Sequence, residues 1–366
     1  MTADTKNDWL QVLRAVAALM VVFFHARILW EGQPLLSGTQ ALLHWGFAGV
    51  DIFFVLSGYV VWKSADNSSF KASRFLTRRF FRVYLGYWCA LALLVSMYAA
   101  SGQLGKLAPE HALGSIFLLN IWLHENWLPT AWSLPYELYF YLWVALLCAL
   151  LPPKGRGPGL VLVLLALAAW TLWCVLRLPH LVAHNVQPFI LLATPMGLQF
   201  LAGALIAKYL KLPSVNTKRR PARAAAIMVL GLVLATLGFL WGRSDPLFDR
   251  VLVWRAISFG WVGVGLLLVA LAASMLQWRA PRMLVTIGDA SYSLYLLHPL
   301  LILFIGKAAS QIPPHSLWHL PLAVASITAM VVISLLWYRR IEKPVYDWAC
   351  GLALQPKARP AHSTQG

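Results

Sequence analysis

Long apolar runs separated by short basic segments dominate the chain. Two of them are VLVLLALAAWTLWCVL at 161–176 and VVISLLWY at 331–338, and neither has the polar face that a water-exposed helix requires. About 20 apolar residues in a helix cross a hydrocarbon core about 30 Å thick. Windows of that length predict about ten transmembrane helices, at 10–30, 42–62, 83–101, 132–151, 159–176, 188–208, 224–242, 252–277, 284–306 and 318–338. The pattern therefore predicts an all-α, polytopic membrane protein.

Composition supports this class and excludes an ordinary soluble protein. The 366 residues are 60% hydrophobic and 12% charged, whereas soluble domains are about 45–50% apolar and about 25% charged. The cysteines have no paired spacing, and three of them fall in predicted spans; they are Cys89, Cys148, Cys174 and Cys350. We therefore predict neither a disulfide nor a metal site.

The basic residues are distributed by side of the membrane. A formal net charge of +17 would be compatible with nucleic-acid binding, but 22 of the 30 Lys and Arg residues lie in segments that share one side of the membrane, and only seven lie on the other. The positive-inside rule then predicts that both termini are cytoplasmic. We expect membrane lipids as partners and no nucleic acid.

The chain is predicted to hold one transmembrane domain, 1–345, and a cytoplasmic tail, 346–366, that is disordered at its end. The first apolar stretch contains Arg14 and His25 and has no small-residue cleavage site, so we expect a retained helix and not a signal peptide. The outer segment 102–131 has an apolar centre too short to cross the membrane comfortably, which leaves a re-entrant or an interfacial position open.

Ionisable side chains inside spans are costly, by about 2.5–3.5 kcal/mol each on insertion scales, and therefore indicate either buried helix pairs or a functional site. The six candidates are Arg14, His25, Asp51, Glu137, Asp289 and His298. Arg14 and His25 are 11 residues apart, which places them on one helix face about 16 Å apart. An arginine near the cytoplasmic mouth suits a phosphate, and a deeper histidine suits proton transfer. A long ligand such as acyl-coenzyme A fits that geometry.

Two further spans carry polar stripes at helical spacing. Ser133, Glu137 and Tyr141 share a face of the fourth span. Glu137 either orients or charge-stabilises the imidazolium of His25 or forms hydrogen bonds in the neighbourhood of Trp132 and Tyr139. The stripe Ser291, Tyr295 and His298 in the ninth span leaves His298 as a structural or a site-lining residue.

Other charged positions also allow two interpretations. Asp51 lies near mid-bilayer without a good packing explanation, whereas Gly49 and Gly58 suit close helix packing. The basic residues Arg78, Arg79 and Arg82 at the start of the third span either anchor that helix in anionic lipid or hold nucleotide phosphates beside Arg14.

These residues occur in motifs that resemble the acyltransferase-3 family of membrane O-acyltransferases. Seven pieces follow in the family's order: LRAVAALMVVFFH (13–25), GVDIFFVLSGY (49–59), FLTRRFFRVYLGYW (75–88), AWSLPYELYFY (131–141), FLAG (200–203), IGDASYSLYLLHP (287–299) and EKP (342–344). The resemblance implies the stand-alone form of the family, without an SGNH domain, in the bacterial inner membrane.

The resemblance also implies an activity and a set of site residues. We expect transfer of an acyl group, usually acetyl, from cytoplasmic acyl-coenzyme A to a hydroxyl of an envelope glycan or its lipid-linked precursor. The expected catalytic residues are His25, Glu137 and Asp51; the donor-binding residues are Arg14, Arg79, Arg82 and Ser57; and the acceptor-binding residues are Trp132, Ser133, Tyr292, Tyr295 and His298. His25 would act as a general base or carry the acyl group transiently.

A proton-coupled secondary transporter or flippase is the alternative from another class. In it, Arg14, Asp51, Glu137 and His298 would line a path for protons or substrate. Binding of coenzyme A distinguishes the two, because only the acyltransferase requires it.

Overall fold

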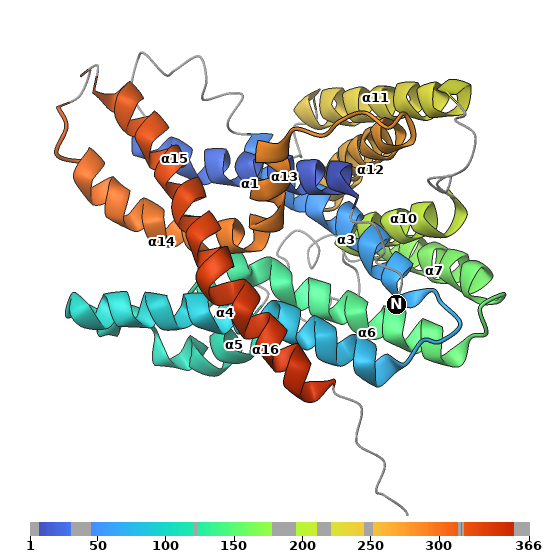
Figure 1. Ribbon diagram of the computed structural model, residues 1–366, viewed down its shortest axis with the longest axis horizontal. Coiled ribbons are helices and arrows are strands. Elements are labelled where there is room, and N and C mark those ends of the chain that lie inside the picture. The colour runs from blue at the N-terminus through green and yellow to red at the C-terminus, as the bar shows by residue number, and fades with distance from the viewer. Residues whose placement is uncertain are drawn as a thin grey trace, which may run out of the picture.

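The computed structural model of the protein describes residues 7–30, 45–120, 123–177, 195–210, 221–244, 252–313, 316 and 318–354. Within these ranges the chain forms helices and no β-strand (Figure 1). Eight helices of the described part are each long and apolar enough to cross a membrane, and one bent pair makes up to nine. The prediction of an all-α polytopic membrane protein is confirmed.

The helices follow the predicted windows closely. The long ones are α1 (Asp8–Ala26), α3 (Gly49–Ala65), α4 (Ala72–Ala100), α6 (Leu134–Leu150), α7 (Arg156–Arg177), α10 (Pro195–Tyr209), α11 (Pro221–Ser244), α12 (Leu252–Met275), α14 (Ser291–Ala309) and α15 (His319–Trp337). The shorter ones are α5 (Ala112–Phe117), α13 (Arg282–Asp289) and α16 (Lys343–Ala353). Helix α10 covers most of the sixth predicted span, whose first residues, 188–194, lie outside the described ranges.

Short 3-10 and π segments connect several of these helices. The 3-10 segments are η1 (Arg27–Trp30), η3 (Trp45–Ala48), η4 (Leu104–Lys106), η5 (Pro109–His111), η6 (Leu123–Glu125) and η7 (Pro129–Ser133). The π segment η8 (Tyr338–Glu342) joins α15 to α16, and the resulting rod runs across α4 (Figure 1). Residues 346–353 of the predicted tail are thus helical, and 355–366 lie outside the described ranges.

Segments that were predicted to share one side of the membrane meet at one end of the bundle. Asp66, after α3, pairs with Arg156 at the start of α7 at 3.5 Å and with Lys208 at the end of α10 at 2.8 Å. At the start of α1, the Asn7 amide donates to Ser274 at 3.1 Å. These contacts match the alternation of spans that the basic residues predicted.

The ninth span is broken and not the continuous helix that the apolar window 284–306 predicted. The axes of α13 and α14 differ by 73° at the break. Gly288 lies so close to α1 that a Cβ there would be 2.0 Å from the carbonyl oxygen of Gln11, which fixes the end of α13 against the first helix. The bend brings Ser291, the first residue of α14, beside Arg14.

The outer segment enters the bundle beside α4. Three side chains of α4 donate to carbonyl oxygens at the end of α5: Tyr87 to Ser115, Trp88 to Ile116 at 2.9 Å, and Tyr84 to Phe117 at 2.9 Å. Trp88 is 12 residues before the end of α4 at Ala100, so this contact lies about 18 Å along the helix from its outer end. Carbonyls at that depth need protein donors. This packing along α4 is what a re-entrant position, one of the two left open for the segment, would produce.

Glycines permit the close crossing of α3 and α10. A Cβ at Gly58 would lie 1.9 Å from the carbonyl oxygen of Phe200, and one at Gly203 would lie 1.9 Å from that of Val55. Small residues let helix backbones approach within a membrane. The FLAG stretch and the Ser-Gly pair of α3 are therefore the two sides of one helix contact, which holds Ser57 in place.

We expect Gly58→Ala to destabilise the protein by about 1–3 kcal/mol, because α3 and α10 must separate to admit the methyl group. Gly351→Ala is the matched control: Gly351 also lies within a helix, but nothing lies within 4 Å of the position that a Cβ there would take, so alanine should be neutral or stabilise by up to about 1 kcal/mol. Thermal unfolding in detergent measures both. Equal melting temperatures for the two variants would contradict the packing argument.

Candidate active site

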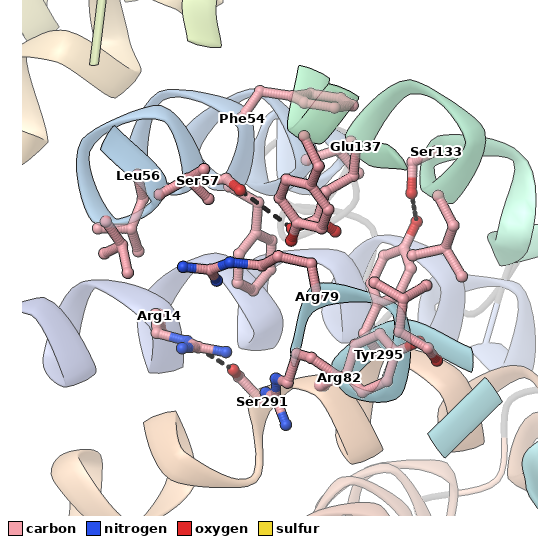
Figure 2. Close-up of a pocket in the computed structure, with 18 residues that line it drawn as sticks. Arg14, Phe54, Leu56, Ser57, Arg79, Arg82, Ser133, Glu137, Ser291 and Tyr295 are labelled. Carbon is pink, nitrogen blue, oxygen red and sulfur yellow. Dashed lines mark hydrogen bonds between the residues drawn. The ribbon is translucent and has the colours of Figure 1, made fainter. Parts of the chain in front are cut away.

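A cavity of about 130 Å³ lies between α1, α3, α4, α6 and α14 (Figure 2). Eight of the predicted site residues line it: Arg14, Ser57, Arg79, Arg82, Ser133, Glu137, Tyr292 and Tyr295. Residues from five helices, far apart in the sequence, thus converge on one space. The expected roles of these eight residues divide among donor binding, catalysis and acceptor binding, so one cavity joins all three.

Three arginines give the cavity its positive side. Figure 2 shows their guanidinium groups on the side away from Ser133. Arg14 donates through Nε to Ser291 at 3.1 Å, and among the described residues its two terminal nitrogens have no hydrogen-bond acceptor, so they can bind a ligand. Arg79 donates through Nη2 to Ser64 at 2.6 Å and lies over the Tyr141 ring, 5.4 Å from its centre. Planar, forked donors of this kind bind phosphate oxygens in pairs.

Arg82 is partly neutralised by a buried carboxylate. Its Nη1 pairs with Oε1 of Glu342, whose side chain is 4% exposed, and Ser293 donates to the other carboxylate oxygen. The guanidinium also lies 5.1 Å from the centre of the Tyr292 ring. In the sequence Glu342 stands out only as part of the EKP motif, and Ser293 was not predicted. Arg82 therefore contributes less net positive charge to the cavity than Arg14, whose hydrogen-bond partner Ser291 is neutral.

Glu137 bonds within the cavity and not to His25. Ser57 donates to its Oε1 at 3.0 Å, and Tyr141 donates to the same oxygen. The hypothesis that Glu137 orients the His25 imidazole is corrected by these contacts. The predicted span began at residue 132, whereas the span in the structure begins at Pro129, with the 3-10 segment η7 before α6. Glu137 therefore lies more than about 10 Å inward from the start of its span, which is too deep to meet His25.

The imidazole of His25 instead meets His298. Nδ1 of His25 lies 3.2 Å from Nε2 of His298 and 2.9 Å from the carbonyl oxygen of Val21. His298 is fully buried, and its Nδ1 lies 3.0 Å from the carbonyl oxygen of Leu294. Neither histidine is among the residues that line the cavity; the structure places His298 against His25.

Tyr295 connects the cavity to the two histidines. Tyr295 lines the cavity, and its ring centre lies 6.1 Å from that of His298. Its hydroxyl shares a hydrogen bond of 2.8 Å with Ser133 and another of 2.8 Å with the carbonyl of Thr130. The stripe Ser291, Tyr295 and His298 therefore runs from the arginines to His25.

Two of the predicted site residues lie elsewhere. Asp51 is fully buried and accepts a hydrogen bond of 2.8 Å from Gln199 on α10, outside the set of cavity-lining residues. Trp132 packs against Tyr136 with ring centres 6.1 Å apart. Gln199 was not predicted, although a glutamine within the apolar run PMGLQFLAG is a visible signal for a buried polar partner.

In the part of the chain that the structure describes, no three His, Cys, Asp or Glu side chains converge as metal ligands. The cavity is lined by three guanidinium groups, which select anions. The residues present thus fit a phosphate-bearing ligand.

Comparison with known proteins identifies the reaction class. The sequence model of the acyltransferase-3 family, described as an acyltransferase domain, matches residues 7–339. The chain belongs to the acyltransferase-3 family. This confirms both the resemblance drawn from the motifs and the prediction of an acyltransferase, and it removes the transporter as a competing class.

Curated relatives of this acyltransferase cover most of its length. The exopolysaccharide production protein ExoZ of Rhizobium meliloti is 27% identical over 311 residues, which are 82% of this chain and 89% of ExoZ. The O-acetyltransferase OatA of Staphylococcus aureus is 23% identical over 358 residues, which are 91% of this chain and 56% of OatA. No solved structure matches the chain.

Proposed function

We propose that this acyltransferase transfers an acetyl group from acyl-coenzyme A to a hydroxyl of an envelope glycan, or of its lipid-linked precursor, in the bacterial inner membrane. One observation carries the proposal: three arginines line one cavity, and Tyr295 and His298 connect that cavity to His25. An anion-binding end and a proton-transfer end are what a nucleotide thioester donor requires.

The arginine end of the cavity would hold the phosphates of the donor. Arg14 is six residues from the start of α1, and Arg79 is seven residues from the start of α4, so both lie about 10 Å from the helix ends that we assign to the cytoplasmic side. The excess of Lys and Arg in the segments at this end supports that orientation. A donor made in the cytoplasm would then reach the arginines without crossing the membrane.

His25 lies toward the opposite side, about 16 Å from Arg14 along α1. In the proposed reaction its imidazole removes the proton of the acceptor hydroxyl as that oxygen attacks the thioester carbon. The new carbon–oxygen bond replaces the carbon–sulfur bond, and His25 returns the proton to the leaving sulfur. General base catalysis of this kind contributes about 10²–10⁴-fold.

The relatives and the re-entrant segment support a glycan acceptor. The name of ExoZ refers to exopolysaccharide production, and that of OatA to O-acetyl transfer. In this chain the re-entrant segment comes from the side opposite the proposed cytoplasmic end and brings Thr130 and Ser133 to Tyr295. A polar hydroxyl-bearing acceptor would approach His25 from that side.

Binding of coenzyme A tests the donor site. We expect the wild-type protein in detergent to bind coenzyme A, and Arg14→Gln to weaken the binding about 10- to 100-fold, because a charge-assisted hydrogen bond contributes about 1.5–3 kcal/mol. Arg74→Gln is the matched control, since Arg74 is an exposed arginine in the first turn of α4 and does not line the cavity. Isothermal titration calorimetry measures all three. Equal affinities of the wild-type and Arg14→Gln proteins would exclude the assigned phosphate site.

A further inference from the structure

We propose that His298 is a positioning residue that fixes the tautomer of His25, so that Nε2 of His25 is the nitrogen that takes the acceptor proton. The inference rests on the proposed function, in which His25 is the base. It concerns a fully buried histidine on α14 for which the sequence predicted substrate binding.

The positions of the four ring nitrogens lead to this assignment. Nδ1 of His298 lies 3.0 Å from the carbonyl oxygen of Leu294. A carbonyl only accepts hydrogen bonds, so this nitrogen carries a proton, and in a neutral imidazole the other nitrogen, Nε2, then has a lone pair.

That lone pair determines the state of His25. Nε2 of His298 lies 3.2 Å from Nδ1 of His25, and the same Nδ1 lies 2.9 Å from the carbonyl oxygen of Val21. Both neighbours are acceptors, so Nδ1 of His25 must be the donor. In the neutral ring, Nε2 of His25 is then unprotonated, and no hydrogen-bond partner for it occurs among the described residues.

The opposite tautomer of His25 is disfavoured by the same contacts. It would direct a lone pair on Nδ1 against the Val21 carbonyl oxygen and against the lone pair of His298. Without His298, the carbonyl of Val21 alone would hold Nδ1–H, and the ring could turn about its χ2 angle. The general rule is that the partner of one imidazole nitrogen sets the proton on the other.

His298 is itself held rigidly. It lies within α14 and is fully buried, and the next residue is Pro299. A neutral imidazole also avoids the cost of a permanent charge at this depth. When His25 takes up the hydroxyl proton, its Nδ1–H strengthens its bonds to His298 and Val21, and the proton on Nε2 then passes to the leaving sulfur. No proton is transferred to His298.

Two replacements of similar size test the assignment. His298→Phe keeps an aromatic ring and removes both nitrogens, whereas His298→Gln keeps an acceptor oxygen near the position of Nε2. With acetyl-CoA as donor and envelope polysaccharide of the source cells as acceptor, we expect His298→Phe to lower kcat on the order of 10²-fold. We expect His298→Gln to remain within about tenfold of wild type, and the Kd for coenzyme A to stay within about twofold in both, since His298 lies outside the donor cavity.

A spectroscopic measurement separates positioning from a general effect on structure. In protein labelled with ¹⁵N-histidine, the His25 signals, assigned by their loss in His25→Ala, should report a protonated Nδ1 and an unprotonated Nε2 in the wild type and in His298→Gln. In His298→Phe they should report a mixture of tautomers. Wild-type kcat in His298→Phe, an unchanged tautomer there, or a kcat in His298→Gln as low as in His298→Phe would each overturn the inference.

The same experiment distinguishes this inference from the proposed function. If His25→Ala is inactive while His298→Phe is fully active, the base is correct and the positioning role is wrong. If His25→Ala transfers acetyl groups at the wild-type rate, the proposed function of His25 fails, and the inference fails with it.

Discussion

Membranes that contain the His25→Ala protein are expected to lose acetyl transfer by at least about 10²-fold. The physical reason is the removal of the general base, whose usual contribution is about 10²–10⁴-fold. Transfer of radiolabelled acetyl groups from acetyl-CoA to envelope polysaccharide measures the loss. Binding of coenzyme A by the same variant should be unchanged, because His25 is not among the residues that line the cavity and Arg14 lies about 16 Å away along α1.

His111→Ala serves as the control for this variant. His111 belongs to the 3-10 segment η5 in the outer segment and lies outside the donor cavity, so its loss should leave transfer at the wild-type rate. A His25→Ala protein that binds coenzyme A and still transfers acetyl at that rate would disprove the assigned base. Recovery of an acetylated histidine from the wild type would instead favour the acyl-carrier role.

The Arg82→Met protein is expected to be destabilised by about 3 kcal/mol. Removal of the guanidinium leaves the carboxylate of Glu342, which is 4% exposed, buried without its cation. The double variant Arg82→Met/Glu342→Gln should recover most of the loss, because no uncompensated charge remains and the amide oxygen can still accept from Ser293. Thermal unfolding in detergent measures both proteins.

An exposed ion pair next to Glu342 provides the control. Lys343 and Asp347 also pair, but each side chain is 55% exposed, and exposed pairs contribute about 0–1 kcal/mol. Lys343→Gln should therefore melt close to the wild type. If Arg82→Met is no less stable than Lys343→Gln, the buried carboxylate of Glu342 does not require the cation of Arg82 for the protein's stability. The double variant should still bind coenzyme A more weakly than wild type, which separates folding from donor binding.

Helical periodicity was sufficient to predict which side chains share one face of a helix. The 11-residue spacing of Arg14 and His25 and the stripe from Ser291 to His298 each placed residues on a common face, and the structure joins both to one site. Apolar length predicted the spans in the same way. These properties depend on residues close together in the chain.

Contacts between distant helices could not be read from the sequence. Arg82 and Glu342 are 260 residues apart, and His25 and His298 are 273 apart, so their partnership depends on how α13 bends and how deep each span begins. Glu137 was assigned to the wrong partner for this reason, since the start of its span at Pro129 sets its depth. Asp51 likewise has a partner, Gln199, on a helix that no local pattern connects to it.

The re-entrant position of the segment before α6 changes the distance over which group transfer must occur. If the arginine cavity opens to the cytoplasm, a segment that descends about 18 Å along α4 from the other face leaves only a thin partition at Tyr295. Donor and acceptor then need not exchange compartments, because the thioester end of the donor has only to pass Tyr295 to meet the acceptor at His25. Such a partition must also block the passage of ions, and Tyr295, whose hydroxyl is held by Ser133 and Thr130, lies at that place.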